Sequence, residues 1–282
     1  MSIVGRDRTG YKLMVPGKRR GFVLDWAGRS DIGRKRAVNE DSVIFGPPVF
    51  AVADGMGGHA AGDRASAAVV ERLAALRAAA EHGYVDFERV EGALSAAASD
   101  IQLFAAHIPI GAGTTVTGAV LAMHNGKPHF AVFNIGDSRV YLLDGHAFSR
   151  VTVDHSVVQE LMDAGLLAEA EAEHHPDSNV ITRAVGFREE PRPDLWMLPV
   201  HAGMRLLLCS DGLTKELDDR MIREHLAAGE SAAATADSLM DAALAAGGRD
   251  NVTVVIIDVV AAAVKPKKHP QTSSSGSVPT PR

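Results

Sequence analysis

Four short segments of this sequence place an aspartate beside a glycine or an asparagine, next to an apolar, strand-like run. The segments are VFAVADGMGG, FAVFNIGDSR, RLLLCSDGL and GGRDNVTVVIIDV, and they hold Asp54, Asp137, Asp211 and Asp250. A buried carboxylate without a matching cation is costly unless something neutralises it. Oxygen-only ligands favour hard divalent ions such as Mg²⁺ or Mn²⁺, whereas structural zinc normally uses Cys or His. The segments therefore predict a divalent-metal site assembled from distant parts of the chain.

Each of these aspartates also has a purely structural interpretation. An isolated Asp54-Gly55 pair is more typical of a tight turn that starts a helix, and Asp137 fits a β-turn equally well. In a metal site, the glycines after Asp54 would let the backbone approach an ion, and the Gly55 carbonyl would be a further ligand. Asp211 and Asp250 stand at strand ends, where a sheet presents side chains rigidly to one rim.

A second charged cluster, in the segment GRKRAVNEDSV, contains Arg36, Glu40 and Asp41. Such a cluster is usually a solvated group of surface ion pairs. In the alternative interpretation, the Arg36 guanidinium grips a phosphate through two hydrogen bonds while the two carboxylates hold metal-bound water.

The composition is that of an acidic globular body with basic ends. The chain has 282 residues, 46% of them hydrophobic, with a mean hydropathy of +0.02 and a net charge of −6, so a large core is expected. Residues 1–40 hold ten Lys or Arg against four Asp or Glu, and residues 261–282 hold four against none. The intervening body is therefore strongly acidic, which argues against nucleic acid as the main ligand and suits cation binding.

Cysteine usage and hydropathy bear on compartment. Cys209 is the only cysteine, which excludes an internal disulfide framework and a Cys-based zinc site. No apolar stretch reaches the ~18 residues of a membrane helix, and the first residues lack the apolar core of a secretory signal. The expectation is a cytoplasmic protein that does not enter a membrane.

Organisation along the chain predicts one domain with polar ends. Residues 1–20 are basic and aperiodic, so they are expected to form an arm or a late addition to the first strand. Residues 21–262 read as one globular domain, and the Pro/Ser-rich basic tail 263–282 is expected to be disordered.

The periodicity of the domain indicates an α+β fold. Alanine-rich helices are expected at 60–80 and 87–107, followed by strands 115–123, 129–135 and 139–143 with Asn-Gly and Asp-Gly hairpin turns. The remaining expected elements are helices 155–165, 219–228 and 231–246 and strands 205–209 and 251–260. Hairpins and paired helices favour antiparallel sheets with helices packed outside them.

Six motifs in a fixed order resemble those of a known family. They are RAVNEDS (36–42), ADGMGGHAAGDRAS (53–66), GTTVT (113–117), IGDSRVYLL (135–143), LCSDGL (208–213) and DNVTVV (250–255). In this order they resemble the signatures of the metal-dependent protein phosphatases, also called protein phosphatase 2C, in their bacterial form. The match runs from residue 29 to residue 260. The resemblance implies a central antiparallel β-sandwich flanked by pairs of antiparallel helices, with a flap at 155–185 near the metal centre.

The resemblance also implies a ligand set for two Mn²⁺ or Mg²⁺ ions. Asp54 would bridge both ions, the Gly55 carbonyl would bind one of them, and Asp211 and Asp250 would bind the other. The residues implied to act around this pair are Glu40 and Asp41, through water, and Asp137 and Asn179, at a weaker third ion.

The implied activity is hydrolysis of phosphoserine and phosphothreonine in proteins by a metal-bridging hydroxide, with Arg36 binding the phosphate. The implied partners are phosphorylated proteins and a Ser/Thr kinase, and the protein is expected to be a monomer. Some family members have a histidine directly after the Asp-Gly pair as a proposed general acid, but Met56 stands there in this chain. His59, three residues further on, is a candidate for contact with substrate or for proton donation through water.

Other phosphate chemistries fit poorly. A cysteine phosphatase needs Cys-x₅-Arg, but Lys215 stands six residues after Cys209, and no glycine-rich segment continues into the Gly-Lys-Ser/Thr of a P-loop. The alternatives left open are a pseudophosphatase that serves as a regulatory binding module and a relative that acts on a phosphorylated anti-sigma antagonist.

Overall fold

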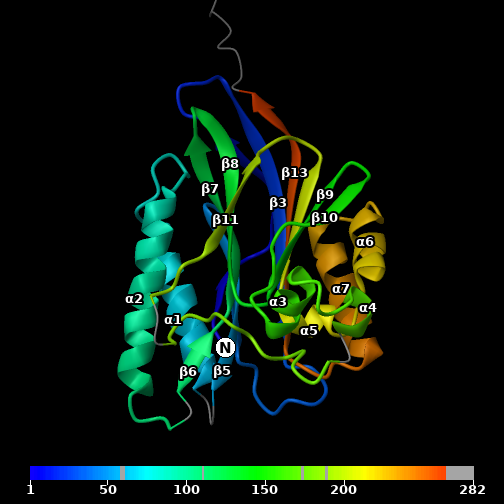
Figure 1. Cartoon of the computed structure of the whole chain (residues 1–282). Helices are drawn as coiled ribbons and strands as arrows, with labels where there is room; N and C mark the ends of the chain where they lie inside the picture. The colour runs from blue at the N-terminus through cyan, green and yellow to red at the C-terminus, as the bar shows by residue number, and fades with distance from the viewer. Residues whose placement is uncertain (58–60, 110, 173–174, 188–189, 265–282) are drawn as a thin grey trace, which may run out of the picture.

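Two β-sheets packed face to face, with helices on both outer faces, make up the domain (Figure 1). The computed structural model describes residues 1–57, 61–109, 111–172, 175–187 and 190–264. One sheet has seven strands in the order β1-β4-β5-β7-β8-β11, with β6 paired to β5, and the other has six in the order β10-β9-β12-β13-β3-β2. Every neighbouring pair is antiparallel except β1 and β4, which run parallel.

The strands of the seven-stranded sheet are β1 (Ile3–Gly5), β4 (Asp41–Phe45), β5 (Val49–Gly57), β6 (Ala112–Thr114), β7 (Val116–His124), β8 (Lys127–Ile135) and β11 (Asp194–Pro199). Those of the six-stranded sheet are β2 (Arg8–Met14), β3 (Arg20–Asp31), β9 (Arg139–Asp144), β10 (Ala147–Arg150), β12 (Met204–Cys209) and β13 (Val252–Val264). The helices are α1 (Gly62–Ala75), α2 (Phe87–Ala105), α3 (Val157–Asp163), α4 (Glu169–Ala172), α5 (Asp211–Thr214), α6 (Asp219–Ala227) and α7 (Ala232–Ala246).

Three layers of apolar packing hold the sheets and helices together. Between the sheets, Phe50 and Phe130 of one meet Leu206 and Ile257 of the other, all 0–1% exposed. A second cluster joins the outer face of the seven-stranded sheet to α1 and α2, and a third joins the six-stranded sheet to α6 and α7. Because both faces of each sheet are covered, central strands such as β5 and β8 are continuously apolar instead of alternating.

The predicted Asn-Gly hairpin joins β7 to β8. Asn125 and Gly126 both have positive φ angles, 50° and 69°, which is the backbone that a two-residue turn between twisted strands requires. This turn fixes the register of the hairpin, which ends with Val116 opposite Ile135. The hairpin therefore carries the segment after Ile135, which includes Asp137, to the same end of the sandwich as the start of β7.

The structure differs from the sequence-based expectation at the N-terminus. Residues 3–5 and 8–14, expected to belong to an arm or to a late addition to the first strand, form β1 and β2, which are separate edge strands of the two sheets. Strand β11 was not predicted, and α1 ends at Ala75, five residues before the expected end. The expected tail lies outside the described residues from 265 onward. Among the helices of the described residues, none has both the length and the apolar character needed to cross a bilayer.

Candidate metal centre

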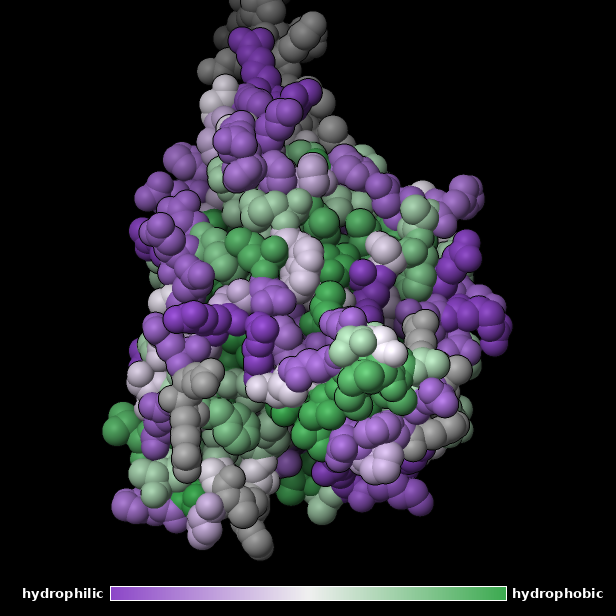
Figure 2. All heavy atoms as spheres, viewed as in Figure 1, coloured by the Kyte–Doolittle hydropathy of each residue, from purple (hydrophilic) through white to green (hydrophobic). Residues whose placement is uncertain are grey.

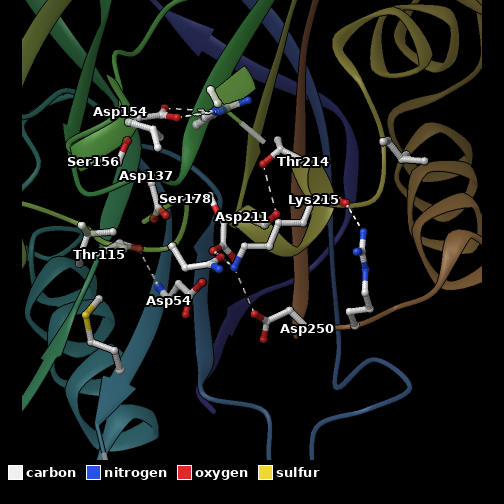
Figure 3. Close-up of a pocket in the computed structure, with 18 of the residues that line it drawn as sticks. Asp54, Thr115, Asp137, Asp154, Ser156, Ser178, Asp211, Thr214, Lys215 and Asp250 are labelled. Atoms are coloured by element: carbon white, nitrogen blue, oxygen red, sulfur yellow. Dashed lines mark hydrogen bonds and ion pairs between the residues drawn. The ribbon is translucent and has the colours of Figure 1, made fainter. Parts of the chain in front are cut away.

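Four aspartates line one cleft at an end of the sandwich (Figure 3). Asp54 belongs to β5 and Asp137 follows β8, so both come from the seven-stranded sheet. Asp211 opens α5 directly after β12, and Asp250 precedes β13, so both come from the six-stranded sheet. The cleft has a volume of about 1210 Å³ and also includes Arg36 in its wall. The structure thus places side chains nearly two hundred residues apart in one cavity.

The backbone around Asp54 is held by two threonines at the start of β7. The Asp54 N–H donates to the Thr115 hydroxyl at 3.1 Å. The Thr114 hydroxyl and the Thr115 N–H donate to the Asp54 carbonyl, both at 2.9 Å. These contacts, which the motif GTTVT supplies, fix the position of the Asp54 backbone relative to the neighbouring sheet strands.

Gly55 sits where the end of β5, the start of α1 and the segment before β4 come together. A Cβ at Gly55 would lie 2.0 Å from the Gly62 carbonyl oxygen and 2.7 Å from that of Glu40. The Gly55 N–H donates to the same Glu40 carbonyl at 3.2 Å. Only glycine fits this approach of backbones, which brings Glu40 to the edge of the cleft.

Asn251 joins the two charged clusters predicted from the sequence. Its side-chain oxygen accepts a hydrogen bond from the Glu40 N–H at 2.9 Å, and its amide group donates to the carbonyls of Ile32 and Val38. A Cβ at Gly212 would lie 1.9 Å from the Asn251 carbonyl oxygen, so the turn after Asp211 packs directly on this residue. The sequence analysis missed Asn251, for which the Asp-Asn pair at the start of DNVTVV is the available signal.

Asp41 lies fully buried behind the cleft, directly across from Asp54 in the β4–β5 pair. The hydroxyls of Ser210 and Thr253 both donate to its Oδ2 atom, at 2.9 and 2.6 Å. Burial raises the pKa of Asp41 to about 7, although these two hydroxyls oppose the shift. Its Oδ1 atom has no hydrogen-bond partner.

The carboxylates in the cleft repel one another. Burial, followed by the charges of Asp41 and Asp211, raises the pKa of Asp54 well above its usual value. Burial and the charge of Asp211 raise the pKa of Asp137 to about 7. The pKa of Glu40 is raised by burial and by Asp63. These shifts come first from burial and second from the neighbouring carboxylates, so this end of the domain concentrates acidic groups where water solvates them poorly.

Two cations reach into the carboxylate group. The Arg36 Nη2 atom lies 2.8 Å from the Asp250 Oδ2 atom, and the Arg36 side chain remains 52% exposed. The Lys215 Nζ atom contacts the Asp211 Oδ2 atom and lies 3.4 Å from the Asp250 Oδ2 atom. No role at the cleft was predicted for Lys215. Its position four residues after Asp211, on one short helical turn, is the sequence signal for its contact with that aspartate.

The donor atoms fit hard divalent ions. The Oδ1 atoms of Asp41 and Asp211 are buried without a hydrogen-bond partner, and the other candidate ligands also present oxygen. Among the described residues, no three His, Cys, Asp or Glu side chains are already grouped as a ready ion site.

Residues of the predicted flap line the same cleft as Asp137, and Figure 1 shows α3 and α4 of this segment close to α5. The flap carries α3 and α4, and the His155 N–H anchors its start by donating to the Gly136 carbonyl at 2.9 Å. Asn179, near the end of the flap, is exposed and lines the same cleft as Asp137. Apolar side chains gather over α3 in Figure 2, beyond which Leu166 is 74% exposed.

Two further residues named from the sequence have different outcomes. His59 lies outside the described residues. Cys209 is fully buried in β12, and this burial raises the pKa of its thiol to about 12. Cys209 is therefore an apolar packing residue and is unsuited to act as a nucleophile.

Comparisons with known proteins agree with the geometry. A family model described as protein phosphatase 2C matches residues 30–246. The serine/threonine protein phosphatase PstP of Mycobacterium tuberculosis is 42% identical over 244 residues, which are 85% of this chain and 46% of PstP. The chain thus spans about half the length of that curated relative. The serine/threonine phosphatase Stp of Listeria monocytogenes is 34% identical over 241 residues, 82% of this chain and 94% of Stp.

Solved structures give the same result. The catalytic domain of PstP in complex with two manganese ions has a TM-score of 0.76 and 40% identity, and the match covers 84% of this chain and 99% of that one. The phosphatase MsPP of Mycobacterium smegmatis in complex with cacodylate has a TM-score of 0.74 and 33% identity, covering 83% and 97%. The predicted α+β sandwich is confirmed, and the chain belongs to the protein phosphatase 2C family.

Proposed function

We propose that this chain is a metal-dependent protein serine/threonine phosphatase. The observation that carries the proposal is the group formed by Asp54, Asp211 and Asp250 at the base of a cleft that concentrates acidic groups. A phosphorylated side chain is itself an anion, so the carboxylates at the bottom of the cleft would repel it unless bound divalent cations neutralise them. The names of PstP and Stp, and the two manganese ions of the PstP domain, support the same activity.

The proposed ligand set follows the placement of the carboxylates. Asp54 and the Gly55 carbonyl would hold one ion, and Asp54 with Asp211 and Asp250 would hold a second. Glu40 and Asp41 would act through water, Asp41 being oriented by its two hydroxyl donors. Two Mn²⁺ or Mg²⁺ ions would lower the pKa of a water molecule and so supply the nucleophile.

The third ion of the proposal involves Asp137 and Asn179. Support comes from the raised pKa of Asp137, to about 7 through burial and the charge of Asp211, and from the shared cleft. An exposed amide contributes little charge, so this site would be the weakest of the three.

Arg36 is the proposed phosphate ligand. Its guanidinium is half exposed at the cleft wall and contacts Asp250 through one terminal nitrogen, which leaves further N–H donors for phosphoryl oxygens. Met56 also lines the cleft and offers no proton, so the leaving group would take its proton from water or from His59.

The proposed substrates are proteins carrying phosphoserine or phosphothreonine, made by a cognate Ser/Thr kinase in the cytoplasm. The phosphatase would act in signal transduction by opposing that kinase, as a monomer. The support is the kind of protein to which the chain is similar, together with a cleft that extends beneath the flap and can admit the residues flanking a phosphorylated side chain.

Metal removal tests the proposed function. Purified protein is expected to hydrolyse p-nitrophenyl phosphate and phosphothreonine peptides with added Mn²⁺ and to be inactive in EDTA, because the nucleophile depends on the ions. Equal rates in both conditions would defeat the proposal. A folded protein that binds Mn²⁺ but hydrolyses neither substrate would be a pseudophosphatase acting as a regulatory module.

Replacement of Arg36 tests the phosphate ligand. Arg36→Ala is expected to raise KM about tenfold or more with a smaller change in kcat, because it removes charge-assisted hydrogen bonds to the phosphate. Arg34→Ala is the matched control, since Arg34 lies on the same loop and outside the lining of the cleft. Steady-state kinetics at saturating Mn²⁺ measure both variants. An unchanged KM for Arg36→Ala would assign Arg36 to its ion pair with Asp250.

A further inference from the structure

Lys215 is the ammonium group closest to the candidate metal ligands. Its Nζ atom contacts the Asp211 Oδ2 atom and lies 3.4 Å from the Asp250 Oδ2 atom, and Figure 3 shows these groups together beside Asp54. The side chains of Asp211 and Asp250 are only 14% and 16% exposed, so solvent screens these contacts weakly. Lys215 thus places a positive charge in contact with two carboxylates that are largely shielded from solvent.

Lys215 and a divalent ion need the same oxygen atoms. An ion held by Asp211 and Asp250 would lie between their carboxylates, where the ammonium now makes its contacts. Two cations cannot share this space, because their repulsion at such a distance is large in a partly buried site. Ion binding therefore requires Lys215 to leave.

The chain allows that movement without a change of backbone. The Lys215 N–H donates to the Asp211 carbonyl at 2.8 Å, which fixes its backbone at the end of α5. The four-carbon stem beyond it is flexible, and the side chain is one-third exposed toward the cleft. The ammonium can thus swing toward the cleft while Asp211 keeps its place.

We propose that Lys215 is a built-in counter-ion that competes with a divalent ion for Asp211 and Asp250. In the protein without ions, it stabilises the two carboxylates against their mutual repulsion. Ion binding breaks the contacts of Lys215 with the two carboxylates, and the loss of these contacts lowers the affinity of the site for the ions. Occupancy of the centre therefore depends on the free Mn²⁺ or Mg²⁺ concentration. This inference rests on the proposed metal centre.

The test compares Mn²⁺ binding and thermal stability in neutral variants. Lys215→Met keeps much of the apolar stem and removes the charge, and Lys215→Gln is a second, shorter variant. Mn²⁺ is titrated by calorimetry into EDTA-treated and dialysed protein, and Tm is measured in EDTA and in Mn²⁺. Both variants are expected to bind Mn²⁺ at least about tenfold more tightly than the unmodified chain. They are also expected to have a lower Tm in EDTA and a larger rise on adding Mn²⁺.

Arg220→Met is the matched control. Arg220 also lines the cleft, but its ion pairs are with Glu224 and Asp218, which are not among the proposed metal ligands. Loss of its charge is expected to change the Mn²⁺ affinity less than about twofold, because exposed charges at a distance are screened. An equal gain in Mn²⁺ affinity from Arg220→Met would show that any positive charge in the cleft has this effect. It would overturn the proposal that Lys215 competes with the ion for the same oxygen atoms.

The two proposals fail separately. If the unmodified chain binds no Mn²⁺, the metal centre is wrong whatever Lys215 does. If it binds Mn²⁺ and the Lys215 variants bind with equal or lower affinity, only the counter-ion proposal fails. Variants that fold in Mn²⁺ but not in EDTA would support it, and variants that fold in neither would assign Lys215 to structure and overturn it.

Discussion

Asp211→Asn is expected to lower kcat by several orders of magnitude and to leave the fold intact. Asparagine has nearly the same shape, but its amide nitrogen cannot bind a divalent ion and its charge is zero. Asp211 is only 14% exposed and lines the same cleft as Asp250 and Asp137, so the substitution removes one of the few carboxylates proposed to hold the ions. Steady-state turnover of a phosphothreonine peptide at saturating Mn²⁺ measures the loss, and circular dichroism checks the fold.

The control for this variant is Asp218→Asn, in the same cleft. Asp218 is exposed, and its side chain caps α6 by accepting a hydrogen bond from the Met221 N–H at 2.7 Å. Asparagine is an equally good N-cap, so the control keeps the helix and removes the same charge. Near-normal turnover by Asp211→Asn, or an equal loss from Asp218→Asn, would remove Asp211 from the metal centre.

Arg205→Ala is expected to lower the free energy of unfolding by about 3–5 kcal/mol. Arg205 on β12 forms two hydrogen bonds with Asp258 on β13, at 2.6 and 2.8 Å, and both side chains are nearly buried. Its remaining N–H groups donate to the Leu226 and Glu230 carbonyls and to the Thr235 hydroxyl, which ties the sheet to α6 and α7. Truncation leaves the Asp258 carboxylate buried without its partner.

An exposed pair gives the comparison for Arg205. Arg72 bonds Asp100 with similar geometry, at 2.7 and 2.9 Å, but the two side chains are 48% and 37% exposed. Arg72→Ala is expected to lower the free energy of unfolding much less than Arg205→Ala, because solvent screens the exposed pair. Chemical denaturation of both variants in Mn²⁺ measures the difference. Equal losses would show that the Arg205 network contributes no more than a surface contact.

Elements with strong local signals were predictable from the sequence. The hairpin of β7 and β8 follows from two alternating runs around Asn125-Gly126, and α2 begins at Phe87 as its apolar spacing indicates. Local backbone preference and side-chain pattern agree in these elements, so no distant contact is needed to specify them.

Elements that depend on distant partners were missed or misjudged. Strand β11 follows Pro191 and Pro193, which reads as a loop, and it becomes a strand because β8 offers a free edge. Strands β1 and β2 are edge strands with one neighbour each in the sheet order, and apart from Leu13 their residues are exposed or only partly buried, so the sequence carries little of the apolar pattern of a strand.

The candidate site divides in the same way. Aspartates at the ends of apolar runs can be recognised from the sequence alone. The structure places four of them, Asp54, Asp137, Asp211 and Asp250, around one cleft. The four-residue spacing signals the contact of Lys215 with Asp211, but its second contact, with Asp250, depends on the packing of α5 against β13 and has no local signal.

The four aspartates of the cleft are divided equally between the two sheets. The seven-stranded sheet supplies Asp54 and Asp137, and the six-stranded sheet supplies Asp211 and Asp250. Neither sheet alone carries more than two of these four aspartates, so the cleft that all four line exists only where the two sheets are packed against each other.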